Sequence, residues 1–334
     1  MIAITGATGH LGQSLLRQLR ARGEKVAAVV RAGSNRGLLE GLCDEIVEAP
    51  LDDPEALAEA FGGARAVIHA AALIDIRRGR MEAMRAVNVT GTANVLEACR
   101  RAGVGRLVYI SSIEALNLHA KERPITEEVG FSRGNAIMEY GETKAEAGLL
   151  VAGAARGGEM EIISLCPTSI VGPWDFRGGL ITTMIRRYLA GKMPASIPGG
   201  FDFVDVRDVA GAALSALHRG RSGEFYLVSG ERASVMELFR TLEDVTGVRG
   251  PRITLPLWLA RAAGEASEAY SRITGRQALF TRGSIDILQI DADIDSSKAG
   301  RELGYGGRSL RECLADTVAW LRGGTDVDPA PAKS

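Results

Sequence analysis

The first 166 residues alternate short apolar runs with stretches of helical periodicity. The apolar runs read MIAIT, KVAAVV, DEIVEA, RAVIHAA, GRLVYISS and MEIISLC. Strands without polar alternation, each followed by a helix, are typical of a parallel sheet covered on both faces. The pattern therefore predicts an α/β fold with a doubly wound parallel sheet, whose ligand crevice lies beyond the carboxyl ends of the strands.

Three glycines, Gly6, Gly9 and Gly12, lie between the first apolar run and the first helical stretch. A glycine at such a junction can adopt a positive φ, admit a ligand or another backbone, and let a helix pack tightly on a strand. The N–H groups of the first helical turn then favour an anion, typically the pyrophosphate of a dinucleotide. We therefore expect a dinucleotide site here, with a glycine-rich turn of no chemical role as the alternative.

The regular alternation fades after residue 170. We predict a dinucleotide-binding domain over residues 1–170 and a smaller, mostly helical substrate-binding or lid region over 171–323, interleaved with the sheet. The tail 324–334 is small, polar and rich in proline, so we expect it to be disordered. Helices in the second half are expected at 206–219, 234–247, 256–274 and 309–322.

Composition excludes several classes of partner. The chain has 40 Lys plus Arg against 41 Asp plus Glu, which gives no electrostatic reason for a nucleic-acid or membrane partner. Its four cysteines and four histidines have no metal-ligand spacing. No run of about 18 apolar residues occurs. We expect a cytoplasmic protein without a metal, acting on a small molecule.

A second group of candidate residues follows the fifth apolar run. That run ends in Ser111 and Ser112, and the motif YGETK places Tyr140 and Lys144 four residues apart, on one face of a helix. A neighbouring ammonium lowers the pKa of a tyrosine, and Ser112 can donate a hydrogen bond to a substrate oxygen. These residues indicate a proton-transfer site for a carbonyl or an alcohol, with a surface Tyr–Lys pair as the alternative.

Taken together, the motifs resemble those of the extended short-chain dehydrogenases/reductases over nearly all of residues 1–323. TGATGHLG is similar to the glycine motif of that family, and VIHAAA, VNVTGTANVLEAC, YISS, YGETK and PTSIVGP follow in its order. FDFVDVRDVAGA and DSSKAGRELGY resemble segments of the dihydroflavonol reductase, 3β-hydroxysteroid dehydrogenase and sugar epimerase branches. The resemblance implies a Rossmann fold and an NAD(P)-dependent enzyme.

The resemblance also implies roles for individual residues. Tyr140 would be the catalytic acid/base, Lys144 would lower its pKa and hold the nicotinamide ribose, and Ser112 would polarise the substrate oxygen. Asn88 would support the active-site water network, with an ordinary helix hydrogen bond as the alternative. His69 is expected to be structural rather than catalytic. The implied cofactor-binding residues are Gly6, Thr8, Gly9, His10, Leu11, Gly12, Arg31, Arg36, Leu51, His69, Ala70, Ala71, Ser111, Tyr140, Lys144, Pro167 and Thr168.

Two positions depart from the family pattern. Pro50, in EAPLDDP, stands where family members usually carry an aspartate that contacts adenine, so adenine must be bound by backbone or other groups. Thr143 replaces the serine common in the family's YxxSK motif. It keeps a hydroxyl, so we expect little consequence.

The end of the second apolar run bears on cofactor choice. Arg31 ends this run and Arg36 follows, with no acidic residue between them. NAD-selective sites usually carry an acidic residue there, whereas an arginine can hold a 2′-phosphate. We therefore expect NADP rather than NAD, with merely solvated arginines as the alternative.

The expected reaction is hydride transfer between nicotinamide and a carbonyl or secondary alcohol of a small, fairly apolar substrate. The apolar segment 253–274 fits a lid over such a substrate, or an ordinary packing helix. The resemblance suggests a homodimer formed through residues 80–102 and 136–156.

Two alternatives remain open. A nucleotide-sugar epimerase or dehydratase would retain its cofactor and would need basic groups for a diphosphate. Candidates for such groups are Arg177, Arg186, Arg232 and Arg282. A regulatory dinucleotide-binding protein without catalysis is the non-enzyme alternative, and the joint presence of Ser112, Tyr140 and Lys144 argues against it.

Overall fold

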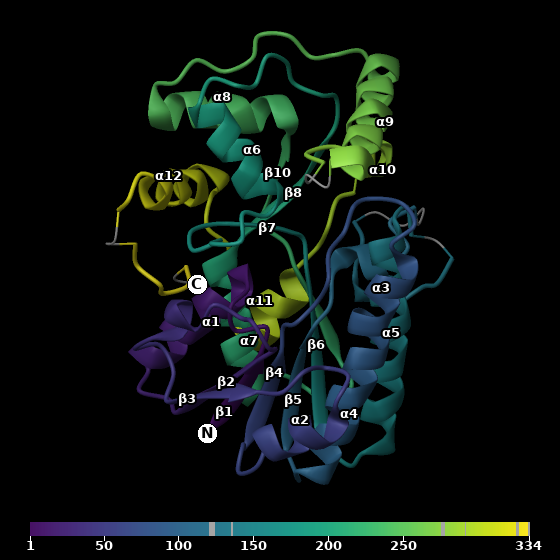
Figure 1. Ribbon diagram of the computed structural model, residues 1–334, viewed down its shortest axis with the longest axis vertical. Coiled ribbons are helices and arrows are strands. Elements are labelled where there is room, and N and C mark those ends of the chain that lie inside the picture. Colours follow the sequence, from purple (N-terminus) through teal and green to yellow (C-terminus); the bar gives the residue numbers. More distant parts are fainter. Residues whose placement is uncertain (120–123, 135, 275–277, 291, 325–326, 333–334) are drawn as a thin grey trace.

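The computed structural model describes residues 1–119, 124–134, 136–274, 278–290, 292–324 and 327–332. Its centre is a parallel sheet of seven strands in the order β3-β2-β1-β4-β5-β6-β9 (Figure 1). The strands are β1 (Ile2–Thr5), β2 (Val26–Val30), β3 (Glu45–Glu48), β4 (Ala66–His69), β5 (Arg106–Ile110), β6 (Glu161–Pro167) and β9 (Phe225–Val228). Because β1 pairs with both β2 and β4, the strand order reverses there. The predicted doubly wound sheet is confirmed.

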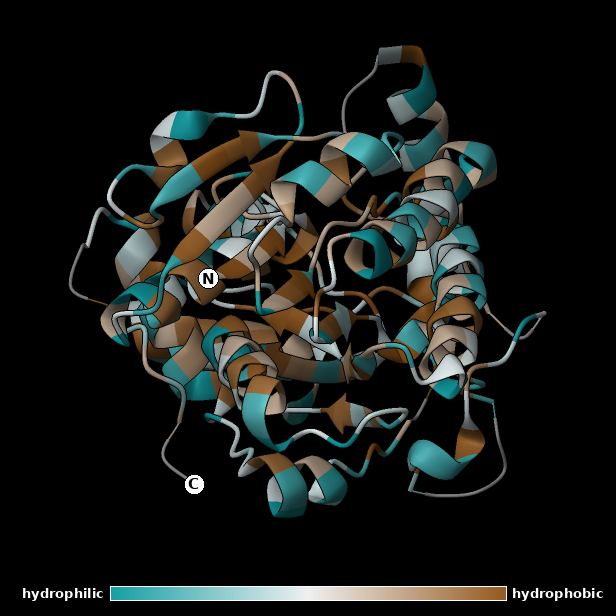
Figure 2. Cartoon of the chain, turned by 90° about the horizontal axis from the view of Figure 1, so that it is seen from below, coloured by the Kyte–Doolittle hydropathy of each residue, from teal (hydrophilic) through white to brown (hydrophobic). Residues whose placement is uncertain are grey.

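Helices cover both faces of this sheet (Figure 1). One layer contains α1 (His10–Ala21), α7 (Val206–Arg219) and α11 (Ser297–Leu303), and the other contains α2 (Pro54–Ala60), α4 (Gly91–Arg101) and α5 (Glu139–Gly157). Apolar residues are concentrated in the strands and on the inner helix faces (Figure 2). Burial of the strands on both faces explains why they lack polar alternation.

The seventh strand comes from the second half of the chain. β9 pairs with β6 in parallel, from Ser164 opposite Phe225 to Pro167 opposite Val228. An apolar run of four residues has no distinctive periodicity, so the sequence pattern does not assign this strand to the large sheet. The chain therefore returns to the sheet through α7 and β9 after it has begun the C-terminal region.

The rest of the C-terminal region forms its own small core. Its sheet has the order β10-β8-β7, with bounds Glu231–Ser234, Gly200–Asp205 and Ser169–Val171. Around it lie α6 (Leu180–Leu189), α8 (Val235–Thr246) and α12 (Leu310–Leu321), while α9 (Leu257–Thr274) and α10 (Arg282–Ile287) pack together beside them. The four helices predicted in this half correspond to α7, α8, α9 and α12.

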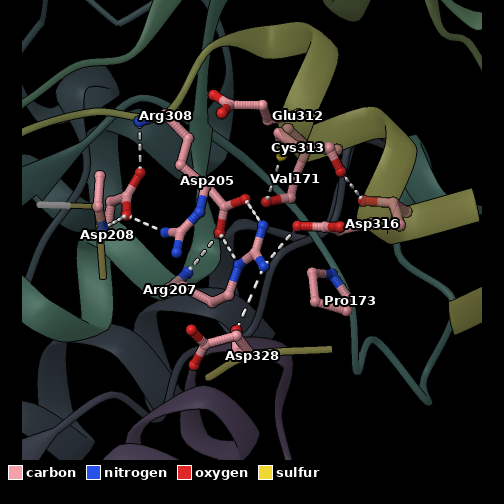
Figure 3. A network of polar contacts seen from close by, with 12 residues as sticks. Val171, Pro173, Asp205, Arg207, Asp208, Arg308, Glu312, Cys313, Asp316 and Asp328 are labelled. Carbon is pink, nitrogen blue, oxygen red and sulfur yellow. Dashed lines mark hydrogen bonds and ion pairs between the residues drawn. The ribbon is translucent and has the colours of Figure 1, made fainter. Parts of the chain in front are cut away.

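A buried ion cluster joins this region to the Rossmann layer (Figure 3). Arg207 donates to both carboxylate oxygens of Asp205, at 2.9 and 2.6 Å, and forms an ion pair with Asp316 on α12 at 2.7 Å. Asp205 also caps α7, since it accepts from the backbone N–H of Arg207. The cluster therefore fixes the start of α7 against α12.

The described part of the C-terminal tail contacts the same cluster. The backbone N–H of Ala332 donates to Asp208 Oδ1 at 2.7 Å. Arg207 Nη1 donates to the carbonyl oxygen of Asp328 at 3.3 Å (Figure 3). These contacts place residues 327–332 beside α7, and the expected disorder of the tail stays a prediction. Within the described ranges, the helices are too short or too polar to cross a membrane.

Candidate active site

Close contacts with backbone atoms explain why two of the three positions after β1 are occupied by glycine. Gly6 has a φ of +76°, and a Cβ atom there would lie 2.7 Å from the backbone nitrogen of Ala71, just beyond β4. A Cβ atom on Gly12 would lie 2.2 Å from the carbonyl oxygen of Gly6. The closeness of Gly6 to Ala70 and Ala71 brings the loops after β1 and β4 together, at the point where the strand order reverses.

Gly9 and the start of α1 leave room for a ligand. A Cβ atom on Gly9 would meet the Gly6 oxygen at 3.1 Å and no other atom within 4 Å in the described part of the chain. No side chain caps α1, and its first turn has no acidic residue, whereas Asp205 and Ser234 cap α7 and α8. The first N–H groups of α1 thus have no side-chain acceptor, and the pyrophosphate of a dinucleotide fits this end of the helix.

The structure brings Ser112, Tyr140 and Lys144 together. Tyr140 and Lys144 lie one turn apart on α5 and are 7% and 2% exposed. Lys144 Nζ donates to the carbonyl oxygen of Ile110, the last residue of β5, at 2.6 Å. Ser112 follows that strand, where its hydroxyl accepts the backbone N–H of Glu114 at 3.2 Å and partly offsets the rise in the Tyr140 pKa. The three side chains therefore meet at the carboxyl edge of the sheet.

Burial dominates the electrostatics of this group. It raises the pKa of Tyr140 well above its usual value, and the nearby Glu114 carboxyl adds to the effect. It also lowers the pKa of Lys144 to about 7. Burial therefore outweighs the expected lowering of the Tyr140 pKa by Lys144, and that effect of Lys144 stays a prediction. The physical reason is that burial disfavours both the ammonium and the phenolate, and that Nζ is bound to the carbonyl oxygen of Ile110.

Glu114 is a residue that the sequence analysis does not single out. Its Oε2 atom is buried and has no hydrogen-bond partner within the described residues, and burial raises the pKa of its carboxyl to about 7. A small cavity beside it has an otherwise apolar lining, formed by Leu116, Leu118, Ala136, Ile137, Ile287 and Ile290. The sequence does contain a signal that could have identified this residue. Glu114 is the one charged residue in the run ISSIEAL, two positions after Ser112.

Asn88 connects the segment after β4 to α5. It lies in a π-helical turn, Ala86–Thr90, between α3 (Met81–Arg85) and α4. Its amide nitrogen donates to the carbonyl oxygen of Leu73 at 2.9 Å and to Thr143 Oγ1 at 3.0 Å. Thr143 in turn donates to the carbonyl oxygen of Tyr140 at 2.8 Å. Asn88 thus helps to position the turn that carries Tyr140, and its contact with active-site water stays a prediction.

His69 has hydrogen bonds on both ring nitrogens. Thr92 donates its hydroxyl proton to the carbonyl oxygen of Asn88 at 2.6 Å, so Thr92 Oγ1 can only accept from His69 Nε2, at 3.1 Å. Nδ1 then accepts from the Thr5 hydroxyl at 2.7 Å. Burial, followed by the charge of Lys144, lowers the pKa of His69 to about 3. The neutral Nε2–H imidazole therefore links β4 to its neighbouring elements.

The two arginines after β2 have different environments. Arg36 forms an ion pair with Glu48 of β3 through one of its terminal nitrogens, at 2.5 Å. Arg31 is exposed and forms no ion pair within the described residues. Other N–H donors of Arg36 are not used by Glu48, so the expected contacts of Arg31 and Arg36 with a 2′-phosphate both stay predictions.

Several other predicted cofactor residues contact protein groups. The ring of His10 hydrogen-bonds the carbonyl oxygen of Pro173 at 3.0 Å, and Thr8 accepts a hydrogen bond from Arg177 at 2.6 Å. Thr168 donates to Asp202 of β8 at 2.5 Å, so its hydroxyl is directed toward the C-terminal region.

The remaining predicted cofactor residues lie along the same edge of the sheet or beneath it. Leu11 is buried in the core, and the carbonyl oxygen of Leu51, one residue after Pro50, accepts from Asn94 at 2.8 Å. Pro167 ends β6, and the buried Ser111 hydroxyl lies beside Tyr109 and Cys166. Their contacts with a cofactor stay predictions.

Comparison with known proteins decides the family. The sequence profile described as the NAD dependent epimerase/dehydratase family matches residues 2–229. The chain belongs to this epimerase/dehydratase family. Sterol demethylase protein B of Methylococcus capsulatus is 37% identical and aligns with 96% of this chain and 97% of its own length. The crystal structure of gox2253 is 32% identical, covers 98% of this chain and 99% of its own, and gives a TM-score of 0.84.

A third relative carries a ketoreductase name. The 4-hydroxy-2-methyl-3-oxo-4-farnesyl-3,4-dihydroquinoline-1-oxide ketoreductase of Stigmatella aurantiaca is 31% identical, and the match covers 94% of each chain. These relatives confirm the predicted membership of the extended short-chain dehydrogenases/reductases. The epimerase/dehydratase-family protein is therefore an NAD(P)-dependent enzyme that acts on small molecules.

Proposed function

We propose that this enzyme is an NADP(H)-dependent reductase or dehydrogenase of a carbonyl or secondary alcohol in a fairly apolar small molecule. The observation that carries the proposal is the meeting of Ser112, Tyr140 and Lys144 at the carboxyl edge of the sheet. The named ketoreductase relative supports the same reaction class.

Each residue has a separate task in the proposed reduction. Bound NADPH supplies the hydride that reaches the carbonyl carbon. Ser112 donates a hydrogen bond that orients the carbonyl oxygen, and Tyr140 gives that oxygen its proton, so that carbonyl, hydride and proton make the alcohol. Burial raises the pKa of Tyr140, which keeps its hydroxyl protonated at neutral pH but makes it a weaker acid, so the transfer needs a group that stabilises the phenolate. Lys144 stabilises the phenolate left behind and binds the nicotinamide ribose.

The surroundings of the site favour an apolar substrate. Ile287 and Ile290, at the end of α10 and just after it, line the cavity beside Glu114 together with Leu116 and Leu118. The cavity itself measures only about 10 Å³, so its apolar lining, and not its size, is what favours an apolar substrate.

The candidate cations for a sugar-nucleotide diphosphate are dispersed. Arg282 forms ion pairs with Glu265 at 2.6 Å and Asp286 at 3.8 Å, and Arg177 is bound to Thr8 of the glycine loop. A diphosphate needs converging cations or helix termini, so these positions argue against the epimerase alternative.

The choice of NADP over NAD is part of the proposal. Arg31 follows β2 without an acidic neighbour in the chain and without an ion-pair partner within the described residues. A replacement Arg31→Asp is expected to narrow or reverse the preference, because an attraction to phosphate becomes a repulsion. Calorimetric titration with NADPH and NADH tests it, and tighter NADH binding by the unmodified protein contradicts it.

A homodimer in the cytoplasm completes the proposal. The helices predicted to form the dimer, over residues 80–102 and 136–156, correspond to the segment from α3 to α4 and to α5. Native mass spectrometry at micromolar concentration is expected to show twice the chain mass of 35.4 kDa. A monomer at that concentration contradicts this part of the proposal.

The reaction class is tested by supplying stoichiometric cofactor with two panels of substrates. One panel contains apolar ketones and secondary alcohols, the other nucleotide sugars, and the absorbance of reduced nicotinamide is followed. Net cofactor turnover with the first panel is expected. Sugar interconversion with a retained nucleotide and no net turnover would replace the proposal with the epimerase alternative.

A further inference from the structure

The loop between β7 and α6 reaches from the C-terminal region onto the glycine loop. Arg177 in this loop donates from Nη2 to Thr8 Oγ1 at 2.6 Å, although the two residues are 169 positions apart in the chain. Thr8 directly precedes Gly9 and the open start of α1. A cation from the C-terminal region therefore lies at the rim of the predicted cofactor site.

The loop is fastened to α1 at two further points. The ring of His10 hydrogen-bonds the carbonyl oxygen of Pro173 at 3.0 Å, and the guanidinium of Arg17 lies 4.9 Å from the centre of the Trp174 ring. Trp174 has a φ of +69°, which a side chain of this size rarely adopts. Such a conformation persists only when surrounding contacts maintain it, so Arg177 is held in place before any ligand binds.

Arg177 has a second cation as its neighbour. Partial burial, followed by the charge of Arg31, lowers the pKa of Arg177. Neither guanidinium forms an ion pair with a carboxylate of the described residues. The nearby Asp175 carboxylate instead accepts the backbone N–H groups of Gly178 and Gly179, at 3.1 and 2.6 Å. Two like charges held close together are unfavourable, and an anion between them removes the cost.

We propose that Arg177, Arg31 and Thr8 together bind the 2′-phosphate of NADP(H), so that a loop of the C-terminal region helps to determine cofactor choice. This inference rests on the proposed NADP(H)-dependent function. A phosphate monoester carries up to two negative charges and three acceptor oxygens, and guanidinium groups match it with paired N–H donors. The pyrophosphate of the dinucleotide is the other phosphate that a glycine loop can approach, and the experiment separates the two.

The test compares NADPH and NADH binding to the unmodified protein and to Arg177→Gln by calorimetric titration. Loss of a charge-assisted contact is expected to weaken NADPH binding about tenfold or more, while NADH binding changes less than about twofold. Arg187→Gln, an exposed arginine on α6 outside the loop, is the matched control and is expected to change neither affinity. If Arg177→Gln unfolds, Arg177→Lys keeps the charge, and the same selective loss is expected in a smaller amount.

Equal weakening of NADPH and NADH would place Arg177 on the pyrophosphate and overturn the inference, and so would unchanged binding of both. The double variant Arg31→Gln with Arg177→Gln is expected to lose less NADPH affinity than the sum of the single losses, because both side chains hold one group. An additive loss would contradict a shared phosphate. Tighter NADH binding by the unmodified protein contradicts the NADP preference itself, whereas the change in the NADPH-to-NADH ratio caused by Arg177→Gln tests Arg177 alone.

Discussion

Two buried clusters of ionisable side chains in this enzyme are built in opposite ways. In the cluster around Arg207, hydrogen bonds to Asp205 and Asp316 outweigh burial, so the pKa of Arg207 is raised and the pKa of Asp205 is lowered. In the cluster around Tyr140, burial prevails, so the pKa of Lys144 falls and those of Tyr140 and Glu114 rise. The Arg207–Asp205 pair thus stabilises its charges, although burial raises the pKa of the neighbouring Asp208, whereas the second cluster disfavours the charges of all three groups.

Because of this difference, we interpret the cluster around Arg207 as structural and the cluster around Tyr140 as chemical. Arg207 and Asp205 pair with each other and join α7, α12 and the tail. Lys144 has only a backbone carbonyl oxygen as its hydrogen-bond partner in the described residues, and Glu114 Oε2 has none. Buried ionisable groups whose charges are not compensated are typical of sites that move protons.

Removing Arg207 should have the largest effect. Arg207→Met keeps much of the volume but leaves the Asp205 carboxylate buried without its partner, and we expect a loss of about 3–5 kcal/mol of unfolding free energy. Denaturant titration checks this. Asp316→Asn should cost less, since the Asp316 side chain is 40% exposed. A loss below about 1 kcal/mol for Arg207→Met would show that the cluster is not structural.

Removing the Tyr140 hydroxyl should affect catalysis and spare the fold. Tyr140→Phe is expected to lower kcat by at least about 10²-fold, equivalent to about 2.7 kcal/mol, with cofactor binding nearly intact. Steady-state kinetics and cofactor titration check this. Unchanged turnover would remove Tyr140 from the mechanism.

Lys144→Ala should change two properties of the enzyme, whereas Tyr140→Phe should change only kcat. Because Lys144 is proposed to bind the nicotinamide ribose as well as to stabilise the phenolate, both kcat and cofactor affinity should fall. Titration of the variant with NADPH distinguishes the two roles, and an unchanged dissociation constant would leave Lys144 with the proton-transfer role alone.

Replacing Glu114 should have the smallest effect of these changes. It should alter how the free energy of unfolding depends on pH. Its folded pKa of about 7 lies above the ordinary value of 4.5, so the protonated carboxyl stabilises the fold below pH 4.5. That stabilisation is lost as the pH rises through about 7. Relative to Glu114→Gln, the unmodified enzyme should therefore lose unfolding free energy between these pH values. A difference that is constant with pH would contradict a raised pKa.

The sequence was informative where local pattern determines structure. The apolar runs predicted the sheet, and the spacing of Tyr140 and Lys144 predicted their common helix face. Contacts between distant segments could not be predicted in this way. The four-residue strand β9 is defined by its pairing with β6, and Arg177 meets Thr8 across 169 positions. Glu48 is likewise separate from Arg36 in the chain, so their ion pair had no local signal.

The central claim is that the enzyme transfers hydride from NADPH to an apolar carbonyl compound. It is tested most directly by incubating the enzyme with an apolar ketone that it turns over and NADPH carrying deuterium at the transferred position of nicotinamide C4, then measuring the product by mass spectrometry. The account predicts one deuterium on the new alcohol carbon for each NADPH oxidised. An alcohol without deuterium, or interconversion of nucleotide sugars with no NADPH oxidised, would contradict it.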